Sequence, residues 1–268
     1  ERSSARETTM RVAAGAIARK LLEDFGIRIY GHVTRIESVV SDFSAADTTV
    51  EPESDEWHSL FERVETAEMA CADPDCNAKM VQRVDEAKEE GTSLGGAFEV
   101  IATGLPVGLG SHVHWDRKLD AQIAHAMMSI NAMKAVEIGM GTGVAERPGR
   151  QVHDELFFDE KLGFHRKRNA AGGLEGGMTN GEPVVVRLSM KPLPTMISPL
   201  QSVDVGTRKP RNAHYERADV CAVPAAVIVA EAMLAMVLAD ALMIKVGGDS
   251  IAEMKRNYEA LPSVPLEW

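Results

Sequence analysis

The chain has 268 residues, of which 45% are hydrophobic and 26% are charged. This composition matches a soluble globular protein with ample material for a core, and the length allows one large domain or two ordinary ones. The net charge of −11 argues against nucleic acid as the main partner, because a phosphate backbone requires a basic face. A small anionic ligand remains compatible, since it needs only a local group of arginines.

Residues 4–24 carry the signals of a helix at the start of the chain. Ser4 and Glu7 fit the S-x-x-E pattern of a capping box, in which each side chain satisfies a backbone N–H near the other residue. An apolar stripe follows at helical spacing, formed by Met10, Ala13, Ile17 and Leu21. The pattern predicts a helix over this segment.

The next segments mix strand and helix patterns. Residues 27–40 are strand-like, and residues 41–58 are acidic and irregular, which predicts a surface excursion. Residues 77–91 form an amphipathic helix ended by Gly91, and residues 96–106 form a strand closed by proline. Strands and helices do not alternate as βαβ units, so the expected class is α+β.

Two short motifs raise the question of a metal. "CADPDC" contains Cys71 and Cys76, but no second cysteine pair or nearby histidine completes a site, so a surface loop is expected. The three cysteines of the chain favour a reducing compartment without disulfides. "HVHWD" offers His112, His114 and Asp116 at alternate positions that a strand can use for a metal. A polar loop leading into a helix capped by Asp116 is the favoured interpretation, and a metal-dependent hydrolase is the alternative.

The second half of the chain contains the clearest elements. Residues 116–134 form a predicted helix, whose apolar positions are Leu119, Ile123, Met127 and Ile130. Residues 183–192 form the clearest strand. The apolar run 224–248 has proline at its first helical position and a Gly-Gly end. It is long enough for a membrane-spanning helix. Because Glu231 and Asp240 interrupt the run without cationic flanks, a core helix over 224–246 is favoured.

Two further motifs concern ligand binding. "AGGLEGGMTNG" (171–181) lacks the G-x-G-x-x-G spacing and precedes a strand, so neither a Rossmann site nor a P-loop is indicated. Its glycines predict either a close backbone approach or a flexible turn. In "RADVCAVP", Arg217 and Asp219 face the same way in an extended segment, just before the apolar helix. With Lys191 of "MKPLPT" they outline one wall of an anion site; the alternative is a structural salt bridge.

Four long blocks carry a resemblance to a known family. They are "RSSARETTMRVAAGAIA", "WDRKLDAQIAHAMMSINAMKAVEIG", "AGGLEGGMTNGEPVVVRLSMKP" and "RADVCAVPAAVIVAEAMLAMVLADAL". In order and spacing the chain resembles chorismate synthase from Arg2 to about Asn257. The resemblance implies an α+β fold, a β-α-β sandwich in which helices 4–24, 116–134 and 224–246 form a central layer between antiparallel sheets. Residues 1–268 are then a single domain that lacks the family's N-terminal portion.

The resemblance implies an enzyme of the shikimate pathway, which leads to the aromatic amino acids. It is an FMN-dependent carbon–oxygen lyase that removes phosphate from 5-enolpyruvylshikimate 3-phosphate by a 1,4-anti elimination, giving chorismate. Reduced FMN is required although the reaction has no net redox change. The family further implies a cytoplasmic homotetramer without nucleic-acid or membrane partners. The sequence has no dinucleotide fingerprint, so it leaves open an NADP-linked flavin reductase activity, and reduced FMN is expected from outside.

The resemblance also assigns residues of a flavin site. The matching positions are Arg2, Ser3, Ser4, Asn131, Ala132, Gly176, Lys191, Pro192, Leu193, Pro194, Thr195 and Arg217. Asp219 matches the carboxylate that acts beside flavin N5 as proton acceptor or relay. For several positions a structural role is the alternative: Ser4 only caps a helix, Asn131 only satisfies backbone groups, and Arg217 only pairs with Asp219.

The resemblance places the family's two catalytic histidines and its substrate-clamping arginines before the "RSSARET" block. None of the eight histidines of this sequence lies in a matching motif. The alternative to the lyase is therefore a non-catalytic fragment that binds flavin or an anion. For a chain that begins at Glu1, the expectation is weak flavin binding at most and no measurable chorismate formation.

Overall fold

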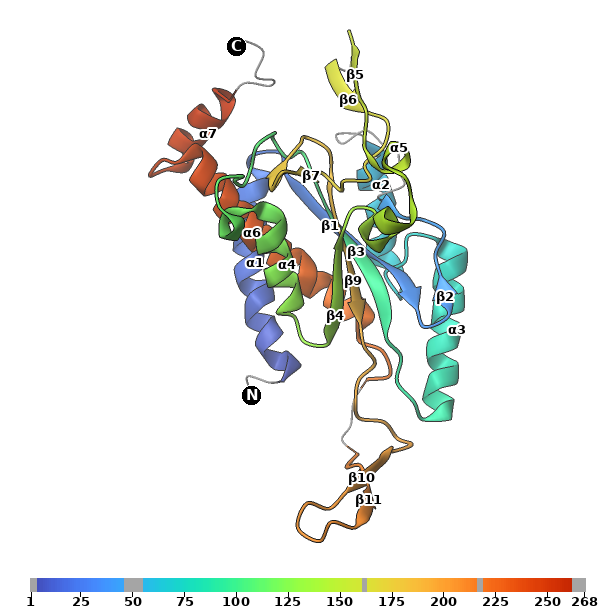
Figure 1. The fold of residues 1–268 in the computed structure, drawn as a ribbon. Coiled ribbons are helices and arrows are strands. Elements are labelled where there is room, and N and C mark those ends of the chain that lie inside the picture. The colour runs from blue at the N-terminus through green and yellow to red at the C-terminus, as the bar shows by residue number, and fades with distance from the viewer. Residues whose placement is uncertain (1–3, 46–54, 161–162, 216–218, 262–268) are drawn as a thin grey trace.

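A five-stranded antiparallel sheet organises the chain (Figure 1). The computed structural model describes residues 4–45, 55–160, 163–215 and 219–261. The strands, in their order across the sheet, are β2 (Val39–Val40), β1 (Arg28–Ile36), β3 (Gly96–Thr103), β9 (Val184–Met190) and β4 (Met133–Ile138). Every neighbouring pair is antiparallel.

Strand β9 confirms the clearest strand prediction. Val184, Val185 and Val186 follow one another and are all fully buried. Successive residues of a strand point to opposite faces, so three consecutive buried valines require cover on both sides of the sheet. The sheet is therefore covered on both faces.

The strand predicted over 27–40 is a hairpin rather than one strand. β1 ends at Ile36 and pairs with β2 through Ile36 and Val39. Glu37 occupies the turn with a positive φ of 49°. The imperfect alternation of this run reflects a reversal of chain direction, which periodicity alone does not reveal.

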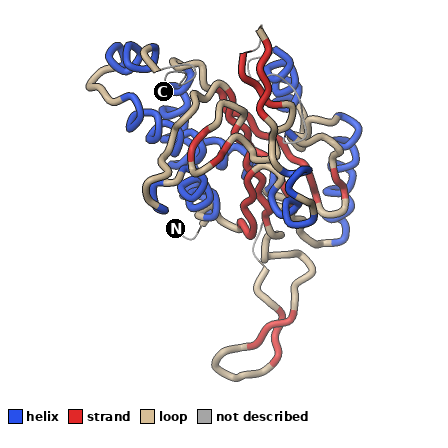
Figure 2. Tube along the Cα trace, turned by 45° about the horizontal axis from the view of Figure 1, so that its top comes forward, coloured by secondary structure: helices blue, strands red, loops and turns tan. Residues whose placement is uncertain are grey.

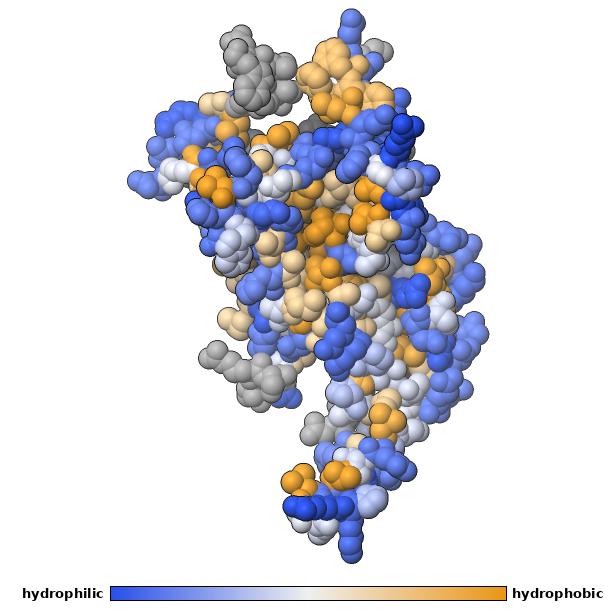
Figure 3. All heavy atoms as spheres, viewed as in Figure 1, coloured by the Kyte–Doolittle hydropathy of each residue, from blue (hydrophilic) through white to orange (hydrophobic). Residues whose placement is uncertain are grey.

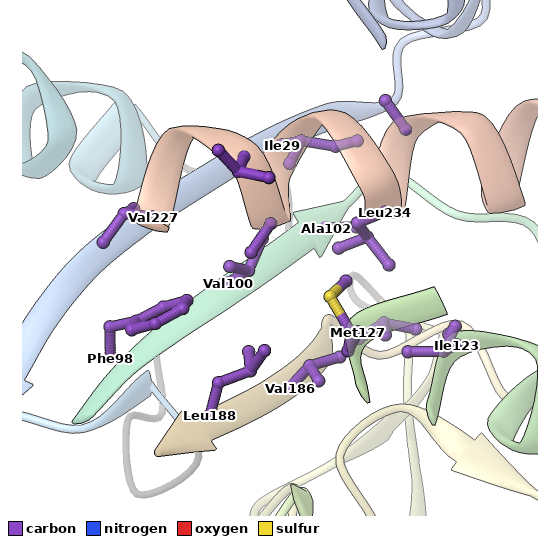
Figure 4. Packing of buried hydrophobic residues seen from close by; sticks show 14 of the residues in the cluster. Ile29, Phe98, Val100, Ala102, Ile123, Met127, Val186, Leu188, Val227 and Leu234 are labelled. Atoms are coloured by element: carbon purple, nitrogen blue, oxygen red, sulfur yellow. The ribbon is translucent and has the colours of Figure 1, made fainter. Parts of the chain in front are cut away.

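Three helices pack on one face of the sheet. They are α1 (Thr8–Glu23), which follows the short 3-10 turn η1 (Ala5–Glu7), α4 (Leu119–Met128) and α6 (Val223–Val246). Figure 4 shows the packing: Phe98 and Val100 of β3 face α6, and Val186 of β9 lies beside Met127 of α4. Burial of these apolar side chains is the main stabilising contribution to this layer.

Helix α6 is the core helix that the sequence predicted. Pro224 stands in its first turn and Gly247 follows its end, with 14 of its 24 residues buried. In the described part of the chain it is the one helix long and apolar enough to cross a membrane, but it is packed inside the protein. Its Glu231 is buried and forms an ion pair of 2.8 Å with Arg19 of α1.

Helices α1 and α6 cross in close contact. A Cβ atom added to Gly15 of α1 would stand 2.4 Å from the Cβ of Ala232, so only glycine permits this approach. The buried residues of α1 are Gly15 and Leu22. Of the apolar stripe, Leu21 packs partly buried against the core, whereas Met10 and Ile17 are largely exposed. The helix itself is confirmed, and contact with α6 selects the small side chain of Gly15.

The helix predicted over 116–134 is shorter in the structure. Residues Trp115–Arg117 form the 3-10 turn η3, and α4 begins at Leu119 without the predicted cap from Asp116. The strand β4 already begins at Met133, which pairs with Met190 of β9. Pairing with a distant strand thus takes residues that the helical pattern had claimed. The four predicted apolar positions, Leu119, Ile123, Met127 and Ile130, are all buried.

Helix α2 (Asp55–Thr66) lies beside the opposite side of the sheet, whereas the buried residues of α3 (Pro74–Glu90) belong to the same hydrophobic cluster as those of α6. Trp57 and Phe61 of α2 pack with Ile101 and Val185, which point away from α6. The predicted surface excursion over 41–58 is therefore wrong for Trp57, while residues 46–54 lie outside the described part. Gly91 caps α3 with φ of 72°, which confirms the predicted end of that helix.

The predicted surface loop at "CADPDC" is also incorrect. Cys71 and Cys76 are both buried, and Cys76 lies in the first turn of α3. Asp73 accepts hydrogen bonds from the backbone N–H groups of Asp75 and Cys76, so it caps the helix. The polar pattern of this segment is that of a helix start, and the cysteines fill the core beneath it.

The remaining elements are small and peripheral. They are η4 (Gly141–Glu146), α5 (Gly149–Val152), the pair β5 (Leu156–Asp159) and β6 (Gly163–Arg166), the pair β7 (Leu174–Glu175) and β8 (Met178–Thr179), the pair β10 (Gln201–Val203) and β11 (Pro210–Asn212), and α7 (Ile251–Glu259). Figure 2 shows the β10–β11 pair standing clear of the body. The predicted α+β class is confirmed, with one large sheet on the helical layer in the described residues.

Candidate active site

Most of the described positions of the predicted flavin site lie at one end of the sheet, where β9 ends and β4 begins (Figure 1). Asn131 and Ala132 form the turn between α4 and β4. Ala132 has a positive φ of 68°, and its carbonyl accepts a hydrogen bond of 3.0 Å from the backbone N–H of Lys191. The structure thus brings the Asn131–Ala132 turn directly beside the Lys191–Thr195 segment.

The Lys191–Thr195 segment is held against the residues that precede β3. The Ser93 hydroxyl donates a hydrogen bond of 2.6 Å to the carbonyl of Leu193. At Gly95, an added Cβ would stand 2.4 Å from the carbonyl oxygen of Met190 and 2.8 Å from the nitrogen of Pro192. The two backbones therefore run in direct contact, which fixes the position of the segment.

The residues that precede β3 also hold the segment before α6. Leu94 donates a backbone hydrogen bond of 2.8 Å to Val220 and forms a parallel bridge with Cys221. This contact places Asp219 close to Ser93 and Leu94, with its side chain exposed. Arg217 lies outside the described residues, so its predicted pairing with Asp219 is not addressed by the structure.

The start of α1 is tied to the same end of the molecule. Arg11 donates a hydrogen bond of 2.8 Å to the hydroxyl of Ser129, two residues before Asn131. Ser4 accepts a hydrogen bond from the backbone N–H of Arg6, so it caps the helix start. The carboxylate of Glu7 pairs with Arg11 at 2.8 Å, so it does not serve the capping box as predicted. Arg2 and Ser3 lie outside the described residues.

Gly176 is not brought to this end. It occupies the turn between β7 and β8 with φ of 61°, and the next residue, Gly177, accepts a backbone hydrogen bond from Leu119 at the start of α4. Asn131 follows the other end of α4, and the ten residues of this helix span about 15 Å. Within one chain, the Gly176 turn and the Asn131 turn are therefore at opposite ends of α4.

The glycine-rich segment 171–181 packs closely against backbone at Gly172 and Gly173. A Cβ added to Gly172 would stand 2.3 Å from the backbone nitrogen of Gly139. Of the two interpretations offered by the sequence, the close backbone approach is the one found. The group that approaches Gly172 is the backbone of Gly139. His112 and His114 are exposed, and no group of three potential metal-binding side chains occurs in the described residues.

The donors available at the Asn131 end suit an anionic ligand. The Lys191 ammonium is exposed and uses one donor for the carbonyl of Pro192 at 3.3 Å, which leaves two donors for a ligand. Ser4 stands at an open helix start, where backbone N–H groups and the helix dipole favour anions. Asp219 adds an exposed carboxylate that can accept a proton.

A second polar cluster, which sequence reasoning missed, is buried on the face opposite α6. His32 contacts Glu99 at 3.1 Å, and Arg187 and Ser44 donate hydrogen bonds of 2.9 and 2.7 Å to the same carboxylate. Burial alone would raise the pKa of Glu99, but the hydrogen bonds and charge of its partners lower it to about 2. The sequence signal that could have revealed this cluster is the presence of Glu99 and Arg187 inside the apolar strands β3 and β9.

A large cavity lies away from the Asn131 end. It measures about 1060 Å³ along the outer side of β1 and is lined by Arg19, Glu231, Tyr30, Phe61 and Trp57, among others. None of the residues assigned to the flavin site lines it. A smaller cavity of about 380 Å³ lies next to Glu175, near the Gly176 turn. Residue chemistry rather than cavity size therefore identifies the candidate site.

Comparison with known proteins extends over almost the whole chain. The family model for chorismate synthase matches residues 1–243. A chorismate synthase of Geobacter metallireducens is 50% identical over 266 residues, and that of Desulforamulus reducens is 52% identical over 255 residues. These alignments cover 97% and 95% of this chain but 65% and 64% of the relatives, so the chain spans about two thirds of their length.

A solved structure gives the same result for the fold. A crystal structure of a chorismate synthase superposes with a TM-score of 0.81 at 44% sequence identity. The superposition covers 96% of this chain and 68% of the other chain.

Proposed function

The chain belongs to the chorismate synthase family, and from this membership we propose that it serves the elimination of phosphate from 5-enolpyruvylshikimate 3-phosphate to give chorismate. The observation that carries the proposal is 50% identity to a named chorismate synthase over 97% of the chain. The proposal includes reduced FMN as cofactor, a homotetrameric assembly and a cytoplasmic location.

The residues at the Asn131 end fit an anionic cofactor in part. Ser4, Asn131, Ala132 and the Lys191–Thr195 segment would hold FMN through hydroxyl, amide, ammonium and backbone groups; the hydrogen bond from Lys191 to Ala132 supports this set. The chemistry supplied by reduced FMN, when bound, is electron donation that is returned by the end of the reaction. Gly176 would join this site only from another location, since α4 separates it from Asn131.

The chain's own residues would bind and move protons. Lys191 would face the phosphate group and stabilise the charge that develops as the C–O bond breaks, because a preorganised cation needs no rearrangement at that moment. Asp219 would receive the proton lost from the ring carbon. The electrons of the broken C–H bond form the new double bond, and those of the C–O bond leave with phosphate, so the elimination is redox neutral.

A second candidate function is flavin or anion binding without turnover. It is favoured by the absence, from this sequence, of histidines in motifs that match the family's catalytic histidines.

The test is an anaerobic assay of the 268-residue chain with chemically reduced FMN and 5-enolpyruvylshikimate 3-phosphate, with the Geobacter metallireducens relative as positive control. Chorismate formation that Asp219→Asn abolishes supports the lyase. Binding of FMN, measured by quenching of its fluorescence, without turnover supports the second function. If the chain neither binds FMN nor forms chorismate, both proposed functions are overturned.

A further inference from the structure

The cavity along the outer side of β1 has the size and the enclosure of a ligand site. Its volume of about 1060 Å³ lies near the upper end of the range for small-molecule sites, roughly 300–1,000 Å³. Strand β2 pairs only with Arg35 and Ile36 of β1. In the described sheet the cavity therefore takes the place that a further strand would hold beside Arg28–Gly31, with α2 on one side and α1 and the start of α6 on the other.

One wall of this cavity is aromatic. Tyr30 of β1 stacks on Phe61 of α2 with ring centroids 4.6 Å apart, and Phe61 lies nearly parallel to Trp57 at 5.9 Å. Helix α3 presents mainly hydrophilic side chains on the face shown in Figure 3, whereas α2 lines the cavity with these rings. A stacked aromatic wall favours a ligand that itself carries an aromatic ring.

The aromatic wall also contains a buried donor without a partner. Trp57 is 2% exposed, and its Nε1–H has no acceptor in the described structure. Buried polar groups almost always have a hydrogen-bond partner, so a ligand of this cavity is expected to bring an acceptor to the wall. A phenolic hydroxyl can accept such a bond while its ring stays in apolar surroundings.

Arg19 lines the same cavity with donors to spare. Its Nη2 group donates to the carboxylate of Glu231 at 2.8 Å and to the carbonyl of Ile29 at 2.9 Å. Because both bonds use one nitrogen, the other two nitrogens keep three N–H groups. The guanidinium is thus held in place and can still bind a carboxylate through two parallel bonds.

Arg28 adds a second cation to this point of the cavity. Its side chain is 53% exposed, and its ion pair with Glu23 is long, at 3.9 Å. Burial raises the pKa of Tyr30, and the positive charges of Arg28 and Arg19 both act against that rise. The two guanidinium groups therefore lie close to the same hydroxyl, which is the arrangement that a single carboxylate can bridge.

Glu65 supplies a negative charge on the same cavity. It is exposed, and it forms no ion pair with any residue that the structure describes. Burial raises the pKa of Glu231, and the negative charge of Glu65 adds to this rise, so the two carboxylates lie within electrostatic reach of each other. An ammonium group at this place would relieve their repulsion.

We propose that this cavity binds an aromatic α-amino acid with a ring hydroxyl, such as L-tyrosine. The ring lies along the aromatic wall and its hydroxyl accepts from Trp57. The carboxylate meets Arg19 and Arg28, and the ammonium meets Glu65. Glu65 follows Trp57 by eight residues of α2, about 12 Å along the axis, which suits an extended tyrosine with a hydrogen bond at each end. The site is independent of the proposed catalysis, because binding is measured without flavin or substrate.

The experiment is isothermal titration calorimetry of the 268-residue chain with L-tyrosine and three analogues. Tyramine lacks the carboxylate, 3-(4-hydroxyphenyl)propanoate lacks the ammonium, and L-phenylalanine lacks the hydroxyl. We expect L-tyrosine to bind, and the first two analogues to bind at least about tenfold more weakly, as expected for the loss of a hydrogen bond to a charged group. L-Phenylalanine should bind several-fold more weakly, because the Trp57 donor then stays unpaired.

Two variants locate the ligand in the cavity. Arg28→Gln should weaken L-tyrosine binding and reduce its advantage over tyramine, while the advantage over 3-(4-hydroxyphenyl)propanoate persists. Glu65→Gln should do the reverse. The matched controls are Arg256→Gln and Glu62→Gln, since both residues are exposed and neither lines the cavity, and they should bind L-tyrosine as the wild type does. Circular dichroism verifies the fold of each variant.

A wild-type chain that does not bind L-tyrosine overturns the proposal. Equal affinity for L-tyrosine and any of the three analogues also overturns it, because the corresponding group then has no partner. Wild-type affinity in both Arg28→Gln and Glu65→Gln would place the ligand elsewhere on the protein, and that result overturns the proposal as well.

Discussion

At the level of single residues, Asp219 is the side chain most directly tied to the proposed chemistry. Its side chain is exposed, and its segment runs beside Ser93 and Leu94. A ligand bound by Lys191 and Asn131 would lie close to this carboxylate. Asp219→Asn keeps the size of the side chain but cannot accept a proton. We expect turnover to fall by about 10²- to 10⁴-fold while the Kd for FMN stays nearly unchanged.

The comparison variant for Asp219 is Arg217→Ala, which deletes a cation rather than a base. It should weaken flavin or substrate binding as well as turnover. Steady-state kinetics and FMN titrations separate the two effects in any preparation with measurable turnover. Wild-type turnover in Asp219→Asn would remove this carboxylate from the mechanism.

Glu99 makes a different prediction, one about stability and pH. Its pKa is lowered from the ordinary 4.5 to about 2, so the fold stabilises the ionised carboxylate. This stabilisation is complete above about pH 4.5 and is lost as pH falls toward 2. A shift of this size corresponds to roughly 3 kcal/mol in the free energy of unfolding.

The variant Glu99→Gln tests this assignment by urea unfolding from neutral pH down to about pH 2, because the stabilisation is lost between about pH 4.5 and about pH 2. The variant should be less stable than the wild type at neutral pH, because Arg187 loses its carboxylate partner. The difference should shrink toward acid. Parallel stability curves for the two proteins would show that Glu99 is not the titrating group.

At the level of whole elements, the contact of α1 with α6 depends on Gly15. In an exposed helix, replacing glycine by alanine stabilises by up to about 1 kcal/mol. Here the added methyl would meet Ala232 at 2.4 Å, so Gly15→Ala should instead destabilise by about 1–3 kcal/mol. Chemical denaturation measures the change.

The control for this contact is a double-mutant cycle with Ala232→Gly, which removes the opposing methyl group. The clash predicts that the double variant loses less stability than the sum of the two single variants. Additive losses would show that the methyl groups at positions 15 and 232 do not clash.

At the level of the whole molecule, one hydrophobic cluster joins the sheet to α1, α4 and α6, so we expect one cooperative unfolding transition. Phe98 is fully buried at the centre of this cluster (Figure 4). Phe98→Ala should lower the free energy of unfolding by about 3–5 kcal/mol.

The single-domain prediction is checked with two probes on opposite sides of the sheet. Circular dichroism follows the helices, and fluorescence follows Trp57 once Trp115 and Trp268 are replaced by phenylalanine. Trp57 packs on the face opposite α6. The two transitions should coincide, and Phe98→Ala should move both together. Separate transitions would divide the chain into two units.

Much of the secondary structure followed from the sequence because its signals are local. Pro224 and Gly247 bracket α6, Gly91 ends α3, and the consecutive valines at 184–186 mark a strand. Caps and breakers act through the backbone of one turn, so neighbouring residues suffice to decide them. The family, too, was identified from the order of long sequence blocks, and it is confirmed.

Other features depend on partners far along the chain, and only the tertiary structure decided them. Met133 and Lys134, which the helical pattern had included, belong to strand β4 because Met133 pairs with Met190. Contact with Ala232 places Gly15 on the buried side of α1 and leaves Ile17 exposed. For the candidate site, the sequence named the residues, but the hydrogen bonds of Ser93, Leu94 and Ala132 bring the segments together. The same fold leaves Gly176 at the far end of α4. Periodicity states which side chains are apolar, whereas burial depends on which distant surfaces meet, and that is settled by packing the whole chain at once.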